Sequence, residues 1–200
     1  AACYDSASPS DAVCSAFTRL QTADGTNPAG TVATGRTTTF NAGQINFKGE
    51  VYYASYGFDL KEVADALAGD ITLGLEATHV SELSTSVTGT TFNRTDNTVE
   101  SPDWTGRFNA GYSYGPLRVS YQLNYLDNVL RVEGATIEND PNPFVDSNIT
   151  HDLSAIYAFD NGLSLRAGVT NLTDEGPSYP TLSYGDILGR RYFAGVNYRF

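Results

Sequence analysis

The stretch that decides the fold of this chain is GRRYFAGVNYRF, residues 189–200. Counted back from Phe200, every second residue is aromatic or apolar, and the residues between them are mostly polar. Residues two apart on a β-strand share a face. The stretch therefore predicts a strand with one apolar and one polar face. A soluble β-sandwich would turn the apolar face inward, whereas a transmembrane β-barrel would turn it toward lipid.

Six earlier stretches alternate in a similar way and predict, together with the last one, about seven long strands. They lie near residues 42–59, 70–84, 104–114, 116–131, 147–159 and 162–172. Gly49 marks a predicted bulge in the first of them, because the alternation before it is poor. The one helical candidate is residues 59–69, so the sequence predicts an all-β fold.

The connections between these strands alternate in length. YGP (114–116) and DNG (160–162) predict tight turns. The segments near 85–103, 132–146 and 173–187 are long, polar and rich in Pro, Asn or Asp. Short turns at one end and long loops at the other are typical of an outer-membrane barrel, whereas a sandwich mixes its loop lengths less regularly.

The aromatic side chains also favour a barrel. In a sandwich, the apolar faces would bury many tyrosine hydroxyls, and each would need a partner. In a barrel, Tyr and Trp lie at the two membrane interfaces, with the ring in lipid and the polar group in water. Six aromatic residues are predicted near strand ends, where such girdles occur: Trp104, Tyr114, Tyr125, Tyr157, Tyr192 and Tyr198. We therefore expect a membrane-spanning, antiparallel, up-and-down β-barrel segment.

Composition excludes several classes of protein. The 200 residues carry a net charge of −11 and no basic cluster, which argues against nucleic acid as a partner. No stretch approaches the roughly 18 apolar residues of a membrane helix. Cys3 and Cys14 do not have the spacing of a two-Cys, two-His zinc site. A disulfide between them, in an oxidising compartment, is favoured over two unpaired thiols.

The residues that could carry chemistry are sparse, and we predict no enzyme, no cofactor and no metal site. His79 and His151 are far apart in sequence and are expected as rim or lumen side chains. NDPNPFVDSN (139–148) contains Asp140 and Asp146 but lacks the ordered ligand repeat of a calcium loop. A solvated loop is the favoured interpretation of that stretch.

The closing segments resemble the C-terminus of the TonB-dependent outer-membrane receptors. AGVTNLTDEGP (167–177) is similar to the element that follows the penultimate strand in that family. YGDILGRRYFAGVNYRF (184–200) is similar to the element that opens and forms the last strand. NAGQINFKGEVYYASY (41–56) is similar to an earlier strand and departs from it at Glu50. The matching residues of the first two elements are Asn171, Leu172, Asp174, Pro177, Gly189, Arg190, Tyr192, Phe193 and Phe200.

The resemblance implies that residues 1–200 are the C-terminal portion of a barrel of about 22 strands. Residues 1–40 would form an extracellular loop with a disulfide, and residues 41–200 would supply barrel strands and loops. No plug-like sequence occurs, so the plug and the N-terminal strands would be partners. The barrel-assembly machinery would read the terminal strand, and the assembly signal would comprise Tyr192, Val196, Tyr198 and Phe200.

The resemblance also implies a function in the outer membrane of a Gram-negative bacterium, in contact with outer-membrane lipid. The intact receptor would bind and import a scarce nutrient (a siderophore, vitamin or oligosaccharide), with energy transmitted by the TonB complex. Ligand contacts are expected from the loops, at Phe92, Asp96, Phe144, Asp146, Tyr179 and Tyr184. One alternative is a small stand-alone outer-membrane barrel with a structural, adhesive or porin-like role, if residues 15–38 add one strand. Another is a soluble, secreted, lectin-like sandwich.

Overall fold

The computed structural model describes residues 14–35 and 43–200, which belong to two units divided after Ala42. The smaller unit holds a 3₁₀ turn η1 (Cys14–Ala16) and two short strands, β1 (Phe17–Arg19) and β2 (Val32–Gly35). These strands pair with each other in antiparallel orientation. The complete eight-stranded barrel considered above would need a long strand in this region, and its described part holds only this short hairpin.

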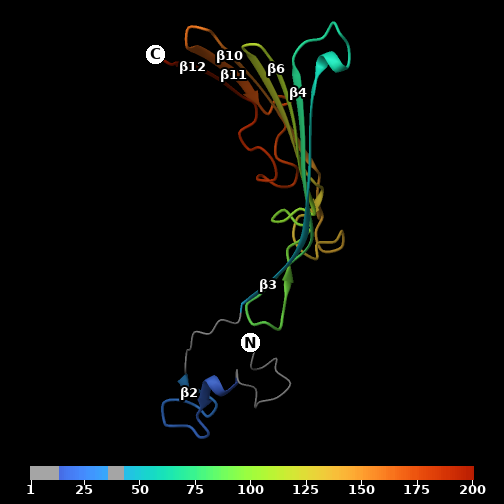
Figure 1. Ribbon diagram of the computed structural model, residues 1–200. Coiled ribbons are helices and arrows are strands. Elements are labelled where there is room, and N and C mark those ends of the chain that lie inside the picture. Colours follow the sequence, from blue (N-terminus) through green and yellow to red (C-terminus); the bar gives the residue numbers. More distant parts are fainter. Residues whose placement is uncertain (1–13, 36–42) are drawn as a thin grey trace. The chain divides into compact units, whose positions relative to one another are not determined.

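The larger unit is built around one antiparallel sheet, with strand order β12-β11-β10-β7-β6-β4-β3 (Figure 1). Each long strand pairs with the long strand that precedes it in the chain, so the sheet is an up-and-down meander. Two short strand pairings involve the loops: β5 pairs with β4, and β8 pairs with β9. The strands are β3 (Gln44–Asp59), β4 (Asp70–Ser86), β5 (Asn93–Arg94), β6 (Trp104–Tyr114), β7 (Leu117–Leu126), β8 (Val129–Leu130), β9 (Phe144–Val145), β10 (Asn148–Ala158), β11 (Leu163–Thr170) and β12 (Arg191–Tyr198).

The seven long strands expected from the sequence are confirmed within the described residues, with two corrections. The strand predicted over 116–131 ends at Leu126, and β8 follows as a separate short element. The helical candidate over 59–69 forms only the 3₁₀ turn η2 (Leu60–Glu62), which Asp59 caps by accepting a 2.9 Å hydrogen bond from Lys61 N. The bulge predicted at Gly49 is present as a register shift between Lys48 and Gly49. No helix in the described ranges is long and apolar enough to cross a membrane.

The shorter and the longer connections lie at opposite ends of the sheet. Residues 60–69, 115–116 and 159–162 join strands at one end, and the chain also ends there (upper part of Figure 1). Residues 87–103, 127–147 and 171–190 join strands at the other end. We call these the turn end and the loop end. The alternation of short and long connections predicted from the sequence is therefore confirmed.

Cross-strand register sorts the side chains of the sheet onto two faces. Directly paired residues share a face, and one such row joins Tyr52, Ala77, Gly106, Tyr125 and Ile149. Apolar and aromatic residues occupy most of the alternate positions on this side of the strands, and we call it the apolar face. Glu50, His79 and His151 also lie on it. The opposite side, the polar face, carries Glu76, Arg107, Asn109, Gln122, Asn124, Asp152, Arg166, Arg191 and Asn197.

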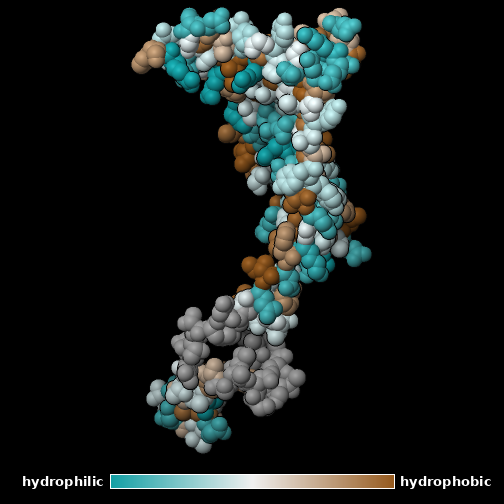
Figure 2. All heavy atoms as spheres, viewed as in Figure 1, coloured by the Kyte–Doolittle hydropathy of each residue, from teal (hydrophilic) through white to brown (hydrophobic). Residues whose placement is uncertain are grey.

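No second layer of described residues covers the apolar face. Tyr56 is 66% exposed, Val196 is 72% exposed and Tyr192 is 75% exposed. Hydrophobic side chains accordingly lie at the molecular surface along the sheet (Figure 2). A soluble sheet buries such a face against another layer. This chain leaves the apolar face available to something outside its described residues.

The strands are offset from one another along their lengths. One row of cross-strand neighbours runs from Tyr56 near the turn end of β3, through Ala110 in β6, to Tyr192 near the loop end of β12. A steady offset of this kind is the stagger that tilts the strands of a barrel. Within the described residues the sheet is open, because β3 and β12 each have one unpaired edge.

Candidate functional site: the polar face and the loop end

The polar face brings hydrogen-bonding side chains from separate strands into direct register. Asn109 of β6 lies opposite Gln122 of β7, which lies opposite Asp152 of β10. One row toward the loop end, Arg107 lies between Glu76 and Asn124. The sequence predicted polar faces, and the register adds which of these residues are neighbours.

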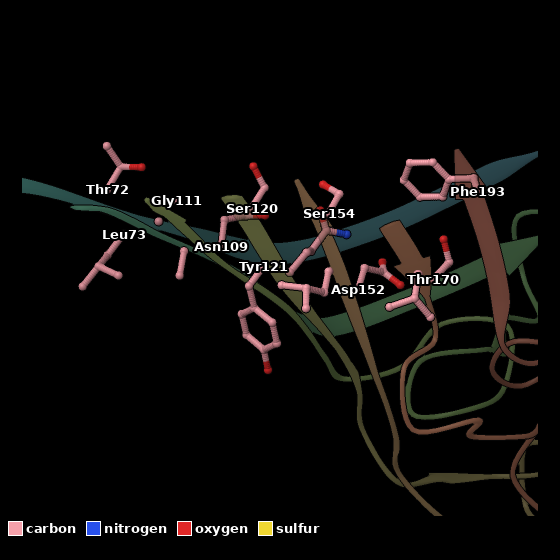
Figure 3. A pocket seen from close by; sticks show the side chains of 15 residues that line it. Thr72, Leu73, Asn109, Gly111, Ser120, Tyr121, Asp152, Ser154, Thr170 and Phe193 are labelled. Carbon is pink, nitrogen blue, oxygen red and sulfur yellow. The ribbon is translucent and has the colours of Figure 1, made fainter. Parts of the chain in front are cut away.

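A groove of about 460 Å³ lies on the polar face, and we call it the polar groove. Thr72, Ser120 and Ser154 point into it from three different strands (Figure 3). Leu73 and Tyr121 also border the groove, but their side chains point to the opposite side of the sheet (Figure 3). The groove is therefore lined by the polar face, while the apolar face lies behind it.

Two glycines hollow the polar groove. Gly74 and Gly111 border it at positions where other residues of the face project a side chain. A Cβ added at Gly111 would lie 2.5 Å from Thr72 Oγ1, so any larger residue would displace that threonine. Sequence alternation predicts which face a residue occupies, but it does not predict the depth that a missing side chain creates.

The carboxylate and carboxamide groups of the polar groove are partly held in place. Asp152 Oδ1 accepts a 2.8 Å hydrogen bond from Asn171 N at the start of the loop after β11. Gln122 Nε2 donates to Asn124 Oδ1 at 2.7 Å. Phe193 closes one side of the groove, and the Arg166 guanidinium carbon lies 5.7 Å from the centroid of its ring. The groove thus combines fixed polar groups with one positioned aromatic ring.

The loop end contains a small buried core. Val129 and Val145 are 2% and 0% exposed, and Tyr184 packs against them. The Tyr184 hydroxyl donates a 2.6 Å hydrogen bond to the Asp127 carbonyl oxygen, and burial raises the pKa of Tyr184. The buried Asn148 donates to Gly176 O at 2.8 Å. Three loop segments distant in sequence are therefore fastened together at this end.

The six residues predicted to contact ligand differ in their surroundings. Phe144 and Tyr179 are 58% and 72% exposed, and Phe92 and Asp146 are also exposed. Asp96 pairs with Arg94 and accepts a hydrogen bond from Leu83 N, and the Arg94 bond holds the pKa of Asp96 below its usual range. Tyr184 belongs to the buried core. Ligand contact stays a prediction, and the two enclosed residues already have partners within the loops.

The two sequence elements that resemble the receptor family meet at the loop end. Asn171 is 0% exposed; its side chain donates to Glu175 O at 2.7 Å and accepts from Glu175 N at 2.8 Å. Asp174 Oδ1 accepts a 2.7 Å hydrogen bond from Arg190 N, which joins the first element to the second. Asp186 pairs with Arg191 at 2.7 Å, which fixes the start of β12. We call this set the loop clamp.

The proposed assembly-signal residues lie on and after the terminal strand. Tyr192, Val196 and Tyr198 occupy the apolar face, opposite Val169, Leu165 and Leu163. Phe200 follows the strand. The recognition of this strand by assembly machinery stays a prediction. In the smaller unit Cys14 is disulfide-bonded, and its predicted partner Cys3 lies outside the described residues.

Both histidines lie on the apolar face rather than on the polar, lumen-type face. His79 Nδ1 is 2.8 Å from Glu50 Oε2, and its ring stacks on Trp104 with centroids 4.4 Å apart. His151 Nδ1 is 2.7 Å from the Tyr121 hydroxyl. A rim or lumen position of the two histidines stays a prediction. Across residues 14–35 and 43–200, no group of three His, Cys, Asp or Glu residues could hold a metal ion.

Comparison with known proteins adds no relative. No family model matches this chain, and neither a curated protein nor a solved structure matches it.

Proposed function

We propose that this chain forms part of the wall of an outer-membrane β-barrel, and that the intact protein is a TonB-dependent receptor that imports a scarce nutrient. The observation that carries the proposal is a one-layer sheet with two unlike faces. The apolar face is uncovered, while the polar face holds charged and amide side chains. Lipid outside and water inside are the surroundings that such a pair of faces requires.

The aromatic residues support the membrane part of the proposal. Trp104 and Tyr114 are the first and last residues of β6, and both lie on the apolar face. The strand has 11 residues, so these two residues are about 33 Å apart along it at about 3.3 Å per residue. At a strand tilt of about 40°, this is about 25 Å along the membrane normal, the height of an outer-membrane apolar band. Tyr125, Tyr157, Tyr192 and Tyr198 lie near strand ends on the same face.

Two further features support a barrel wall over a sandwich layer. The steady stagger of the strands is what barrel closure requires. The unpaired edges of β3 and β12 would be costly in lipid, so we propose that each pairs with further strands of a larger barrel. The receptor part of the proposal depends on the resemblance of residues 167–177 and 184–200. Three of the matching residues, Asn171, Asp174 and Arg190, belong to the loop clamp.

The lipid-facing surface can be tested with spin labels at two neighbouring positions of β11. Leu165 lies on the apolar face and Ser164 on the polar face. In the protein reconstituted in bilayers, a label at residue 165 should collide more often with oxygen than with a water-soluble nickel chelate. A label at residue 164 should show the reverse. Protection of residue 165 from both reagents would indicate a covering protein layer and would refute the barrel.

The receptor part needs a separate measurement. We expect the chain, extracted in mild detergent, to travel in a particle that also contains plug and additional strand sequence. Uptake of the nutrient should stop when the proton gradient across the inner membrane is collapsed. A folded, monomeric chain that closes alone would instead support the stand-alone barrel, with a structural, adhesive or porin-like role.

A further inference from the structure

We propose that the polar groove binds a neutral, polyhydroxylated ligand, such as a segment of an oligosaccharide. The inference rests on the proposed function, because it takes the polar face as the water-filled side of the wall. Of the three nutrient classes considered above (siderophore, vitamin and oligosaccharide), it selects the oligosaccharide. Four properties of the groove carry it, and they concern charge, hydrogen-bonding capacity, shape and length.

The charge of the groove excludes an anionic ligand. Its lining contains no Lys, Arg or His among the described residues, and Asp152 is its one charged side chain. Sites for phosphate or carboxylate groups use Arg or Lys, or backbone amides at a helix N-terminus. Neither is present in this lining. A ligand that meets Asp152 must therefore be neutral there, or must donate hydrogen bonds to it.

The hydrogen-bonding capacity of the groove is largely unused. Within the described residues, five lining side chains form no hydrogen bond to the rest of the chain: Thr72, Asn109, Ser120, Ser154 and Thr170. Four of them are hydroxyls, which both donate and accept, and the fifth is a carboxamide with both functions. The hydroxyl groups of a sugar have the same dual capacity. Such a surface matches a polyhydroxylated ligand group by group.

The shape of the groove adds a flat apolar element. A Cβ added at Gly168 would lie 2.5 Å from the Phe193 ring, so the ring lies over this glycine. The Phe193 ring lies at the border of the groove (Figure 3). It packs over Gly168, and the Arg166 guanidinium carbon lies 5.7 Å from its centroid. A pyranose ring presents C–H groups on its faces and hydroxyls at its edge. An aromatic ring beside an array of hydroxyls can contact both parts of such a molecule.

The groove continues toward the turn end, which favours a chain-like ligand. A second groove of about 400 Å³ shares Thr72, Gly111 and Ser120 with the first. Asp70, Ser113 and Arg118 extend its polar lining toward the turns. The two grooves together form a polar track that crosses the sheet from β12 to β4 and then extends toward the turn end along β4, β6 and β7. A ligand of several sugar units could occupy successive positions on this track as it moves along the wall.

The test is calorimetric titration of the intact purified protein in a detergent without a sugar head group. The probes are maltohexaose, cellohexaose and xylohexaose, with inorganic phosphate as the anionic comparison. We expect at least one hexasaccharide to bind with a Kd of about 1 mM or lower, and phosphate not to bind. Saturation by phosphate alone, or no hexasaccharide binding below about 10 mM, would overturn the proposal.

Two matched variants locate the binding. Thr72→Val removes a hydroxyl from the groove while keeping the shape of the side chain. Thr78→Val makes the same change on the same face of β4, outside both grooves. We expect Thr72→Val to weaken hexasaccharide binding about fivefold, equivalent to one lost hydrogen bond, and Thr78→Val to leave it unchanged. Equal effects of the two variants would place the ligand elsewhere and refute the site.

This failure can be told apart from failure of the proposed function. If the spin labels report lipid at residue 165 and no hexasaccharide binds, only the ligand class is wrong. If residue 165 is protected from both collision reagents, the barrel itself is wrong, whatever the titration gives.

Discussion

The loop end and the sheet obtain their stability in different ways. The loop end buries Val129, Val145 and Asn171 to 2% exposure or less, whereas the sheet exposes both of its faces. The buried side chains of Asn148 and Asn171 at the loop end find partners inside the chain, whereas Oδ1 of Asp103 has none among the described residues. The apolar side chains of the sheet find none in the described residues. The comparison teaches that the loop end is stabilised by contacts within the chain, while the sheet leaves its apolar face to surroundings outside the described residues. Under the proposed function those surroundings are lipid and neighbouring strands.

The largest expected effect comes from placing a charge on the uncovered apolar face. Ala167→Arg should lower the free energy of unfolding in a lipid bilayer by about 2–4 kcal/mol, the cost measured for Arg near the bilayer midplane. Ser164→Arg places the same side chain on the polar face of the same strand and should cost far less. Denaturant titration in vesicles measures both. Equal costs would show that the two faces meet similar surroundings.

The next effect concerns the loop clamp. Asn171→Ala removes a buried side chain that both donates to and accepts from Glu175, and it leaves alanine at a φ of 54°. We expect a loss of about 2–3 kcal/mol in the free energy of unfolding, because a buried hydrogen-bond pair and a backbone preference are lost together. The exposed Asn128→Ala is the control and should stay within about 0.5 kcal/mol. Hydrogen exchange at the Glu175 amide should rise only in the first variant.

A third prediction tests packing within the wall. Gly168→Ala brings a Cβ to 2.5 Å from the Phe193 ring and 2.7 Å from the Leu153 carbonyl oxygen, and backbone oxygen cannot move aside easily. Overpacking of this kind costs about 1–3 kcal/mol. Gly176→Ala is the control, because nothing lies within 4 Å of the added Cβ and no positive φ constrains it. Similar stability of the two variants would show that the Phe193 ring does not rest on Gly168.

The strands were predictable from the sequence because alternation reports directly which residues share a face. The strand near 104–114 matches β6 over its full length, since each of its positions fits one face or the other. The strand predicted over 116–131 was too long because Val129 and Leu130 are apolar, yet they form the separate short strand β8, and Val129 belongs to the buried loop core. Alternation of apolar and polar residues does not distinguish a long strand of the large sheet from a short strand in a loop.

The candidate site was less predictable, for two physical reasons. The depth of the polar groove depends on the absence of side chains at Gly74 and Gly111. The alternation of polar and apolar residues predicts faces, but it does not predict where a face is hollowed. The loop clamp depends on contacts between residues 171–175 and 186–191, which only a folded loop brings together. The resemblance singled out Asn171, Asp174 and Arg190, but it did not predict the hydrogen bonds that these residues form. The predicted loop residue Tyr184 was likewise not foreseen as part of a core.

The smallest expected effect is a pH dependence confined to the loop end. The hydrogen bond from Arg191 is the main cause that holds the pKa of Asp186 below its ordinary value of about 3.9, so the unfolded chain binds this proton more readily than the folded one. The Asp186 contacts therefore add stability above about pH 4 and lose it as the pH falls through the lower, folded-state pKa.

Asp186→Asn should consequently flatten the loss of Tm between pH 7 and pH 3, whereas Asp160→Asn at the exposed β10–β11 turn should not. The measurement is thermal unfolding of both variants and the parent across that range. Because Asp186 fastens the start of β12 and accepts a hydrogen bond from the Leu188 amide, the change should also appear as a lower protection factor of that amide at low pH in the parent. An unchanged pH profile in Asp186→Asn would mean that the ion pair between Asp186 and Arg191 at the start of β12 does not contribute to the stability of the loop end.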